Sequence, residues 1–316
     1  MFWRAGGEVA RDEGSAAVPQ HIAVSLRLTG RFFQFVRGCA SLSRGIASNF
    51  KVVDRKGRAF PQYAAAKPQW PMDINGRTIL VTGASRGLGR TLVFAFAKAG
   101  AKEVFAGARK KEDIERLKSD AAAMGASITP IKLDVTNDDD VNATKSLGPI
   151  DVLVNNAGVA GYGNPASMSL DSATEEMNVN YFGALRMTRA LAPAMLERGQ
   201  GMIVNVATAF AKINLPIVGT YCASKAALLS LGQAMRAYFA EKGIHVMTVM
   251  PTTIDTDMSK GADVPKMTTE FVANEILHHI REESIDPPIG EEAEKVLEGL
   301  RTDPIALEKM LSQIRA

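Results

Sequence analysis

The sequence predicts a doubly wound α/β domain, in which helices cover both faces of a parallel sheet. Two features from Arg77 onward carry this prediction: short apolar runs alternate with longer helical stretches, and a glycine-rich turn joins the first run to the first helical stretch. Runs that are brief, rich in Val and Ile and bounded by turn residues are typical of strands buried on both faces. Strict alternation of strand and helix implies right-handed crossovers, and therefore a parallel sheet in a three-layer α/β/α arrangement.

Six apolar runs are the predicted strands. They are Thr78–Thr82, Glu103–Gly107, Thr129–Leu133, Asp151–Asn155, Met202–Val206 and His245–Met250. The stretches with helical texture include Leu88–Ala99, Lys111–Met124, Asp171–Glu197 and Tyr221–Lys242. We expect these elements to form a single domain that spans residues 72–316.

Residues 1–71 form an N-terminal extension with a different texture. They carry scattered Arg, Gly, Ser and Gln with no sustained period of 2 or 3.6, and the segment Met72–Arg77 directly precedes the first predicted strand. Our first interpretation is a largely disordered segment that is either appended to the domain or included through a wrongly assigned start. An organelle-targeting segment and a structural arm are the alternatives.

One part of the extension, Arg31–Ile46, mixes basic, apolar and small residues and is compatible with an amphipathic helix. That composition is typical of organelle transit peptides. Glu8, Asp12 and Glu13 argue against this interpretation, because transit peptides avoid acidic residues. The expected location is therefore cytoplasmic, with organelle targeting as the alternative.

The composition of the 316 residues excludes several classes of function. A net charge of +3 without charge blocks gives no reason to expect nucleic acid as a partner. Cys39 and Cys222 have no metal-ligand or redox spacing, and the four histidines form no ligand pattern, so neither a metal site nor a disulfide framework is predicted. No apolar stretch is long enough to span a bilayer.

A glycine-rich turn, Thr82–Gly89 (TGASRGLG), follows the first predicted strand and opens the first predicted helix. Glycines allow a tight turn and the close approach of a pyrophosphate, and the helix start offers unpaired N–H groups. Gly83, Gly87 and Gly89 are spaced differently from the usual GxGxxG of dinucleotide sites, but the strand–turn–helix context is the same. The turn therefore predicts a Rossmann-type dinucleotide site.

Charge near the second strand indicates which dinucleotide is preferred. An NAD site usually has an acid at the end of that strand to bind the ribose hydroxyls, whereas Phe105–Arg109 ends in a base and Lys110 follows. Arg86 adds a guanidinium within the glycine-rich turn. Two guanidiniums suit a 2′-phosphate, so NADP(H) is predicted over NAD(H). The alternative is that Arg109 and Lys110 are a solvated loop pair.

Tyr221 and Lys225 lie at positions i and i+4 of a predicted helix, so their side chains share one face. A phenol titrates near pH ~10 and is a poor base at neutral pH. A neighbouring ammonium stabilises the phenolate and is expected to lower that pKa. The pair is therefore a candidate acid–base centre.

Several motifs occur together in one order, and with them the chain resembles the classical short-chain dehydrogenases/reductases. The resemblance covers about Asn75–Thr256. The motifs are Thr82–Gly89 (TGASRGLG), Asp134 in LDVT, Asn155–Gly158 (NNAG), Asn180 in VNYFG, Tyr221–Lys225 (YCASK) and Pro251–Thr256 (PTTIDT).

The resemblance implies a role for each catalytic candidate. Tyr221 would protonate a carbonyl oxygen in reduction and act as the base in the reverse direction. Lys225 would lower the pKa of Tyr221 and bind the nicotinamide ribose, and Asn180 would hold a water that links Lys225 to solvent. Thr208 stands where the family normally has a serine that orients the substrate oxygen, and it keeps the hydroxyl. Thr252 stands where the family usually has glycine.

The resemblance also implies a set of cofactor contacts. Asp134 would face the adenine, Asn156 would support the cofactor end of the sheet, and Ile254 and Thr256 would meet the carboxamide. The full predicted set is Gly83, Ser85, Arg86, Gly87, Leu88, Gly89, Arg109, Asp134, Asn156, Ala157, Gly158, Tyr221, Lys225, Pro251, Ile254 and Thr256.

The C-terminal stretch departs from the family. Many relatives end in a seventh strand, whereas Glu282–Ala316 indicates a turn at Asp286-Pro287-Pro288 followed by polar amphipathic helices. The long helices that begin near Asp171 and Tyr221 would still pair between subunits. A homodimer or homotetramer is therefore expected.

The predicted function is that of an NADP-dependent oxidoreductase acting on a carbonyl or alcohol. The mostly apolar Phe210–Val218 favours a neutral ketone, aldehyde or secondary alcohol, although Lys212 offers a partner for a carboxylate. The polar Asp257–Lys266 suits a mobile lid. The alternatives are a non-catalytic redox sensor that binds the dinucleotide, and a dehydratase or epimerase on the same scaffold.

Overall fold

The computed structural model describes residues 23–28, 31–36, 51–53, 73–163 and 166–314, and the chain divides into one unit over residues 1–65 and another over 66–316. In the first unit β1 (Ala23–Leu28), β2 (Arg31–Val36) and β3 (Lys51–Val53) form an antiparallel sheet in that order. The helix expected over Arg31–Ile46 is therefore wrong for its first six residues, since aromatic and β-branched residues suit a strand.

The remainder of Arg31–Ile46 lies outside the described residues. So do residues 1–22 and 54–72, which include the boundary expected between residues 71 and 72. The domain boundary, the disorder and the targeting role assigned to the extension therefore stay predictions.

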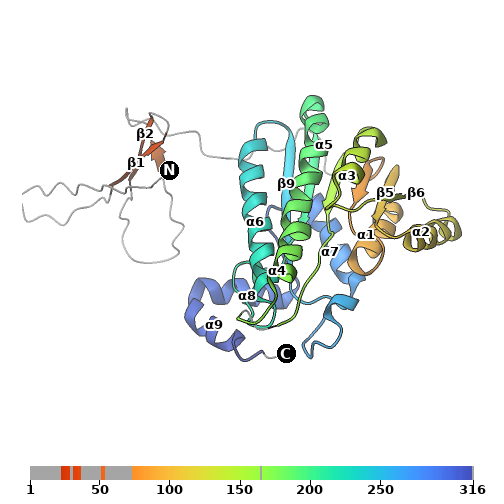
Figure 1. The fold of residues 1–316 in the computed structure, drawn as a ribbon. Coiled ribbons are helices and arrows are strands. Elements are labelled where there is room, and N and C mark those ends of the chain that lie inside the picture. The colour runs from red at the N-terminus through yellow and green to blue at the C-terminus, as the bar shows by residue number, and fades with distance from the viewer. Residues whose placement is uncertain (1–22, 29–30, 37–50, 54–72, 164–165, 315–316) are drawn as a thin grey trace, which may run out of the picture. The chain divides into compact units, whose positions relative to one another are not determined.

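The second unit contains a parallel seven-stranded sheet with the strand order β10-β9-β8-β7-β4-β5-β6, of which Figure 1 labels β9, β5 and β6. All six predicted strands are present, which confirms the doubly wound fold. The six are β4 (Thr78–Val81), β5 (Glu103–Ala108), β6 (Ile128–Lys132), β7 (Val152–Asn155), β8 (Gly201–Val206) and β9 (Ile244–Pro251), and the seventh strand is β10 (Pro288–Ile289).

Side chains of the central strands alternate between two apolar clusters, one on each face of the sheet. In β4, Ile79 and Val81 belong to one cluster and Leu80 to the other, and all three are fully buried. β8 repeats the pattern with Met202 and Ile203. This alternation explains why the strands are apolar in unbroken runs, because both of their faces are covered.

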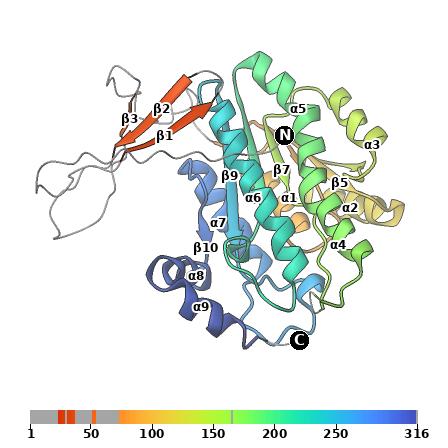
Figure 2. The same ribbon diagram turned by 60° about the vertical axis from the view of Figure 1, so that its left-hand side comes forward.

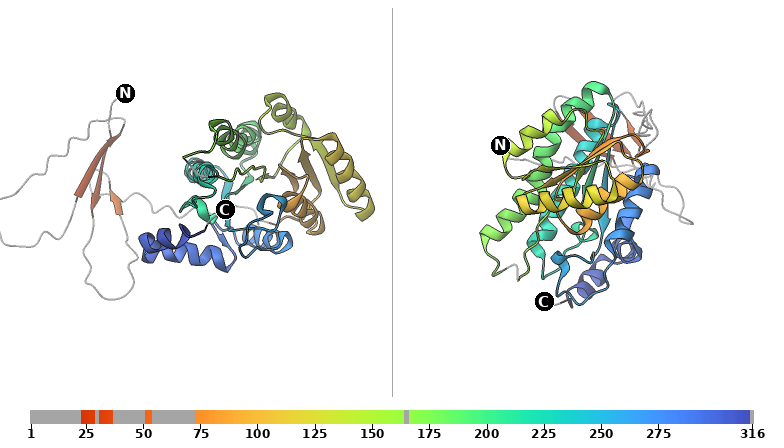
Figure 3. Two further views of the ribbon diagram at one scale, coloured as in Figure 1. Left: turned by 60° about the horizontal axis from the view of Figure 1, so that its bottom comes forward. Right: turned by 90° about the vertical axis from the view of Figure 1, so that its right-hand side faces the viewer.

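Helices cover each face of the sheet, as the two views in Figure 3 show. The first cluster includes residues of α1 (Gly87–Lys98), α2 (Lys111–Met124) and α7 (Thr269–Arg281). The second cluster includes residues of α3 (Asp138–Ala143), α5 (Ala184–Arg198) and α6 (Gly219–Phe239).

The helix expected over Asp171–Glu197 is not regular throughout. α4 (Leu170–Met177) passes into the π-helical turn η2 (Asn178–Gly183), and α5 continues from there. A π-helical turn inserts one extra residue into the ring of each hydrogen bond, and such turns are frequent at functional sites. Here the turn carries Asn180, one of the predicted site residues.

The end of the chain differs in part from the prediction. The stretch expected as a turn in place of a seventh strand contains β10, which pairs in parallel with Met250 and Pro251 of β9. A two-residue edge strand that begins with proline has little strand signal in its sequence. The helices expected after it are present as α8 (Glu291–Thr302) and α9 (Pro304–Leu311), and Figure 2 shows them near the end of the sheet where β10 lies.

Candidate active site

The strands β4 and β7 are neighbours, although β5 and β6 lie between them in sequence, so the winding of the sheet reverses at this pair. Ligands of open α/β sheets bind outside the carboxyl ends of the strands at such a reversal. A cleft of about 1490 Å³ opens there. Of the predicted site residues, all but Asn180 line this cleft.

The glycine-rich turn is shaped by close backbone contacts. Gly83 has a φ of +65°, and a Cβ on it would lie 2.7 Å from the Cα of Ala157. A Cβ on Gly89 would overlap the carbonyl oxygen of Gly83 and the side-chain amide of Asn156. The turn therefore needs glycine at both positions to bring its backbone to the floor of the cleft.

Asn156 fastens this turn to the end of β7. Its Nδ2 donates to the carbonyl oxygens of Thr82 at 2.9 Å and Gly83 at 3.1 Å. The hydroxyl of Thr82 accepts hydrogen bonds from the backbone N–H groups of Asn156 and Ala157, each at 3.0 Å. Thr82 was not among the predicted site residues, although its place at the end of the first strand is a signal that would have found it.

The start of α1 fits an anionic group such as a dinucleotide pyrophosphate. Its N-cap is Arg86, which makes no side-chain cap, and Gly87 follows with a φ of +53°. The first N–H groups of a helix have no partners within the helix, and here no side chain caps them. Glycines, uncapped N–H groups and the positive end of the helix dipole together suit a phosphate.

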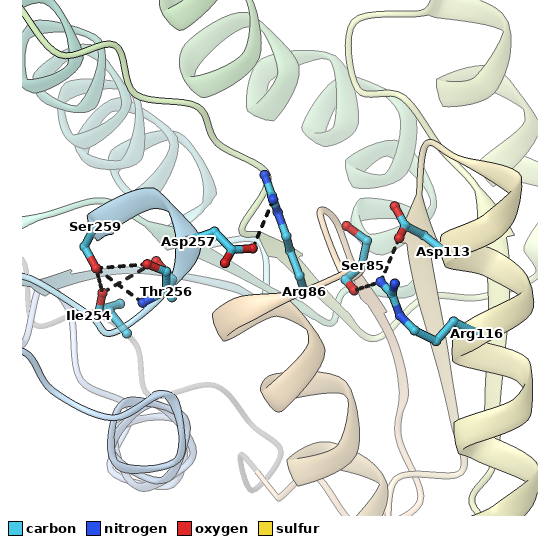
Figure 4. A network of polar contacts seen from close by, with 8 residues as sticks. All are labelled: Ser85, Arg86, Asp113, Arg116, Ile254, Thr256, Asp257 and Ser259. Atoms are coloured by element: carbon cyan, nitrogen blue, oxygen red, sulfur yellow. Dashed lines mark hydrogen bonds and ion pairs between the residues drawn. The ribbon is translucent and has the colours of Figure 1, made fainter. Parts of the chain in front are cut away.

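Basic side chains gather at one end of the cleft (Figure 4). Arg86 pairs with Asp257 at 3.0 Å, and both side chains are largely exposed. Such a surface pair contributes only about 0–1 kcal/mol, so Arg86 is able to exchange it for a ligand. Arg109 and Lys110 are also exposed and line the cleft.

Arg116 of α2 is a further base at this end that the sequence analysis missed. It donates to the carbonyl oxygen of Ser85 at 2.9 Å and pairs with Asp113 at 2.7 Å. Both residues line the cleft, so an acid is present here as well (Figure 4). Since Arg86 and Arg116 are each paired with an aspartate, the remaining positive charge at this end is that of Arg109 and Lys110, which form no ion pair among the described residues.

Tyr221 and Lys225 meet within the cleft. They lie in the first two turns of α6, and the Nζ of Lys225 is 5.8 Å from the centre of the Tyr221 ring. Lys225 is buried, and its Nζ donates to the carbonyl oxygen of Val206 at 2.8 Å. A Cβ on Gly158 would lie 3.3 Å from that Nζ, so the pair is next to the loop after β7.

The pKa of Tyr221 departs in the opposite direction from the one expected. Burial raises the pKa of this phenol above its usual range, and the nearby Cys222, Tyr162 and Glu176 raise it further. Burial also lowers the pKa of Lys225 to about 8. In the protein alone, removal from water thus outweighs any effect of the cation near the ring, and the lowering of the pKa that is expected from Lys225 stays a prediction.

Thr208 is buried beside the pair, with its hydroxyl engaged by the backbone. It donates to the carbonyl oxygen of Pro251 at 2.9 Å and accepts from the N–H of Phe210 at 3.3 Å. A hydroxyl has one proton, so Thr208 must release Pro251 before it donates to a substrate oxygen. Thr252, the other departure from the family, has no positive φ and does not need glycine.

Asn180 does not line the cleft but forms hydrogen bonds with two elements that do. Its Oδ1 accepts from the N–H of Val159 at 2.9 Å, and its Nδ2 donates to the Val159 carbonyl at 2.9 Å and to the Ser224 hydroxyl at 2.8 Å. This amide therefore ties the loop after β7 to α6. The water relay expected of it stays a prediction.

Glu176 is a second buried group that the sequence analysis missed. It is 1% exposed, and its Oε1 accepts from the N–H of Gly161 at 2.6 Å. Its Oε2 is buried without a hydrogen-bond partner among the described residues. Glu176 thus holds the loop that follows Val159, which lines the cleft.

The substrate side of the cleft is largely apolar. It is lined by Phe210, Leu215, Ile217 and Val218. Lys212 does not line it, so the expectation that Lys212 offers a partner for a substrate carboxylate is wrong. The expected lid segment begins with η4 (Asp257–Ser259), and the hydroxyl of Tyr162 donates to the Met258 carbonyl at 2.8 Å. The mobility of the segment stays a prediction.

Neither a cluster of metal-binding side chains nor a membrane-spanning helix is found in the part of the chain that the structure describes. No three or more His, Cys, Asp or Glu side chains gather there in a way that would hold a metal ion. No helix within the described ranges combines the length and apolarity that crossing a membrane requires. Cys222 is free and buried, and Cys39 lies outside the described residues.

Comparisons with known proteins agree with this geometry. The family model described as short chain dehydrogenase matches residues 77–265. A solved short chain dehydrogenase from Burkholderia cenocepacia in complex with NADP is 36% identical, with a TM-score of 0.70 over 76% of this chain and 98% of that chain.

Two curated relatives are similar to more than half of the chain. The ketoacyl reductase HetN of a Nostoc species is 34% identical over 225 residues, 67% of this chain and 78% of its own length. A dehydrogenase/reductase SDR family protein 7-like of Anopheles gambiae is 36% identical over 199 residues, 60% of this chain and 62% of its own length. The chain thus spans less than two thirds of the latter.

Proposed function

Since this chain belongs to the short-chain dehydrogenases, we propose that it is an NADP-dependent oxidoreductase that moves a hydride between nicotinamide and a carbonyl or alcohol, with Tyr221 as the general acid and base. The family binds a nicotinamide dinucleotide and comprises oxidoreductases. The observation that carries the proposal is the meeting of Tyr221 and Lys225 in the cleft that the glycine-rich turn also lines. A neutral ketone, aldehyde or secondary alcohol is the proposed substrate.

The bound dinucleotide would supply or accept the hydride at its nicotinamide ring. The N–H groups at the start of α1 and the turn around Gly83 would hold its pyrophosphate. In reduction, Tyr221 would donate its proton to the carbonyl oxygen as negative charge develops there. Burial leaves the phenol of Tyr221 protonated at neutral pH in the protein alone, which is the form that a proton donor requires. The charged Lys225 would stabilise the phenolate that remains.

The test of the proposal is a panel of carbonyl compounds and alcohols offered with NADPH, NADH and their oxidised forms, with absorbance of the reduced cofactor as the readout. We expect steady oxidation of NADPH with at least one neutral carbonyl. Cofactor binding without turnover throughout the panel would contradict the catalytic proposal and favour the redox sensor.

We predict that Arg109→Glu weakens NADPH use. Hydrogen bonds to charged groups contribute about 1.5–3 kcal/mol, so the KM for NADPH should rise by about 10- to 100-fold, while the KM for NADH changes by less than about threefold. Lys118→Gln is the matched control, because Lys118 is an exposed base of α2 that does not line the cleft. An equal change in both KM values would show that Arg109 does not read the 2′-phosphate.

We predict that reduction slows as the pH rises through about 8. The pKa of Lys225 is lowered to about 8, so the ammonium is present below that pH and is lost above it. Without it the phenolate left by proton donation has no counter-charge. The kcat for NADPH oxidation measured from pH 6 to pH 10 should therefore be level at first and then fall. A kcat that rises up to pH 10 would contradict this role of Lys225.

We propose further that the protein is a cytoplasmic homodimer or homotetramer. Exposed aromatic side chains on the long helices support self-association, namely Phe182 at 44% and Tyr238 at 63% exposure. Light scattering after size-exclusion chromatography tests this, and a monomer at micromolar concentration would contradict it.

A further inference from the structure

The C-terminal helix presents one of its faces to the cleft that contains Tyr221. Residues at helical spacing in and around α9 line that cleft: Asp303, Ala306, Leu307, Met310, Leu311 and Ile314. Ile305 lies off this face and does not line the cleft. Figure 1 shows α8 and α9 near the lower end of α6, and Tyr221 in the first turn of α6 packs against the apolar cluster that contains Leu307 and Leu311 of α9.

The loop after β8 forms the wall that faces this helix. Its residues Leu215 and Val218 belong to one apolar cluster with Leu307 and Leu311 of α9, and all four are buried. Phe210, Ile217 and Ile314 are only partly buried against the same cluster, and all three line the cleft. The buried cluster holds α9 and the loop after β8 in place. The partly buried side chains remain accessible from the cleft and are able to contact a ligand.

The size of the cleft exceeds the need of a single small ligand. Ligand sites commonly have volumes of about 300–1,000 Å³, and this cleft measures about 1490 Å³. The part near the glycine-rich turn fits a dinucleotide, which leaves the part between Phe210 and α9. The helix α9 (Pro304–Leu311) alone spans about 12 Å at the helical rise of about 1.5 Å per residue, and Ile314 extends this wall beyond it. Such length suits an extended chain better than a compact ring.

Among the described residues, the charged groups that line this part of the cleft lie on α8 and at the start of α9. Glu292 and Lys295 lie on α8, and Lys295 is already paired with Glu291 and Glu292 at 2.9 Å each. Asp303 accepts a hydrogen bond from the N–H of Ala306 as the N-cap of α9. These groups are satisfied locally, so the two walls offer mainly hydrophobic contact.

We infer that α9 and the loop after β8 form a binding site for an extended hydrocarbon chain, and that the substrate is a long-chain aliphatic carbonyl compound or alcohol. This inference rests on the proposed function, because the carbonyl of that substrate would lie at Tyr221. Met310 is the most informative side chain, since it is 61% exposed and lines the cleft.

A series of methyl ketones from four to ten carbons, reduced with NADPH, tests the inference. Burial of one methylene contributes enough to raise kcat/KM by about fourfold, so the longer ketones should be the better substrates by a steep and regular trend. Met310→Glu should lower kcat/KM for the ten-carbon ketone at least about tenfold and leave the four-carbon ketone unchanged. Ile305→Glu is the matched control, because Ile305 is 65% exposed on the same helix but outside the cleft.

Fluorescence of cis-parinaric acid, a long-chain probe, measures the site without turnover. The wild-type protein, Tyr221→Phe and Ile305→Glu should bind it, and Met310→Glu should bind it at least about tenfold more weakly. NADPH oxidation with no dependence on chain length would overturn the inference and leave the proposed function intact. Probe binding that depends on Met310, without turnover of any ketone or alcohol, would support the apolar site and contradict the proposed function. Equal probe binding by both Glu variants would overturn the inference.

Discussion

Tyr221→Phe should lower kcat for carbonyl reduction by about 10²–10⁴-fold, the range that a positioned general acid contributes. The substitution removes only the hydroxyl and keeps the ring that packs against the apolar cluster of the substrate side. The dissociation constant for NADPH should change by less than about threefold, because the glycine-rich turn and the start of α1 are untouched. Stopped-flow absorbance measures the rate, and quenching of protein fluorescence measures cofactor binding.

Tyr238→Phe is the matched control for this experiment. Tyr238 lies on the same helix, is 63% exposed and does not line the cleft. Its variant should keep the wild-type kcat. A Tyr221→Phe enzyme that retains more than a tenth of the wild-type rate would remove Tyr221 from the role of proton donor.

Gly89→Ala should weaken cofactor binding and destabilise the protein. A Cβ at this position would overlap the Gly83 carbonyl oxygen and the side-chain amide of Asn156, so the turn must open or α1 must shift. Overpacking of this kind costs about 1–3 kcal/mol in the free energy of unfolding. Because the displaced groups line the cleft, the dissociation constant for NADPH should rise by more than about tenfold.

Lys98→Ala is a suitable control, since Lys98 is exposed in the last turn of the same helix. Chemical denaturation gives the free energy of unfolding, and fluorescence titration gives the dissociation constant. A Gly89→Ala protein that is folded and binds NADPH as tightly as the wild type would contradict the assignment of the turn as the phosphate site.

The alternation of strands and helices was predictable because burial on both faces of the sheet leaves a clear pattern. The run Met202–Val206 lies within β8, which begins one residue earlier. β10 was missed because two residues carry no periodicity. The π-helical turn Asn178–Gly183 was missed because an apolar pattern does not register a change in hydrogen-bond spacing.

Most of the site was predictable because its motifs follow strands whose carboxyl ends meet at one edge of the sheet. Arg116, Glu176 and the face of α9 were missed, since each reaches the cleft or its loops through tertiary packing that local spacing does not record. The raised pKa of Tyr221 in the protein alone was missed for a related reason. The spacing of Tyr221 and Lys225 gives their proximity but not the loss of water around them.

Transfer of deuterium tests the central claim most directly. The enzyme is given NADPH in which both hydrogens at C4 of the nicotinamide are deuterium, together with the carbonyl panel, and mass spectrometry locates the label in the products. The account predicts one deuterium on the carbinol carbon of an alcohol for each labelled hydride used. Cofactor that binds but delivers no deuterium to any compound, or product that forms without net oxidation of NADPH, would contradict it.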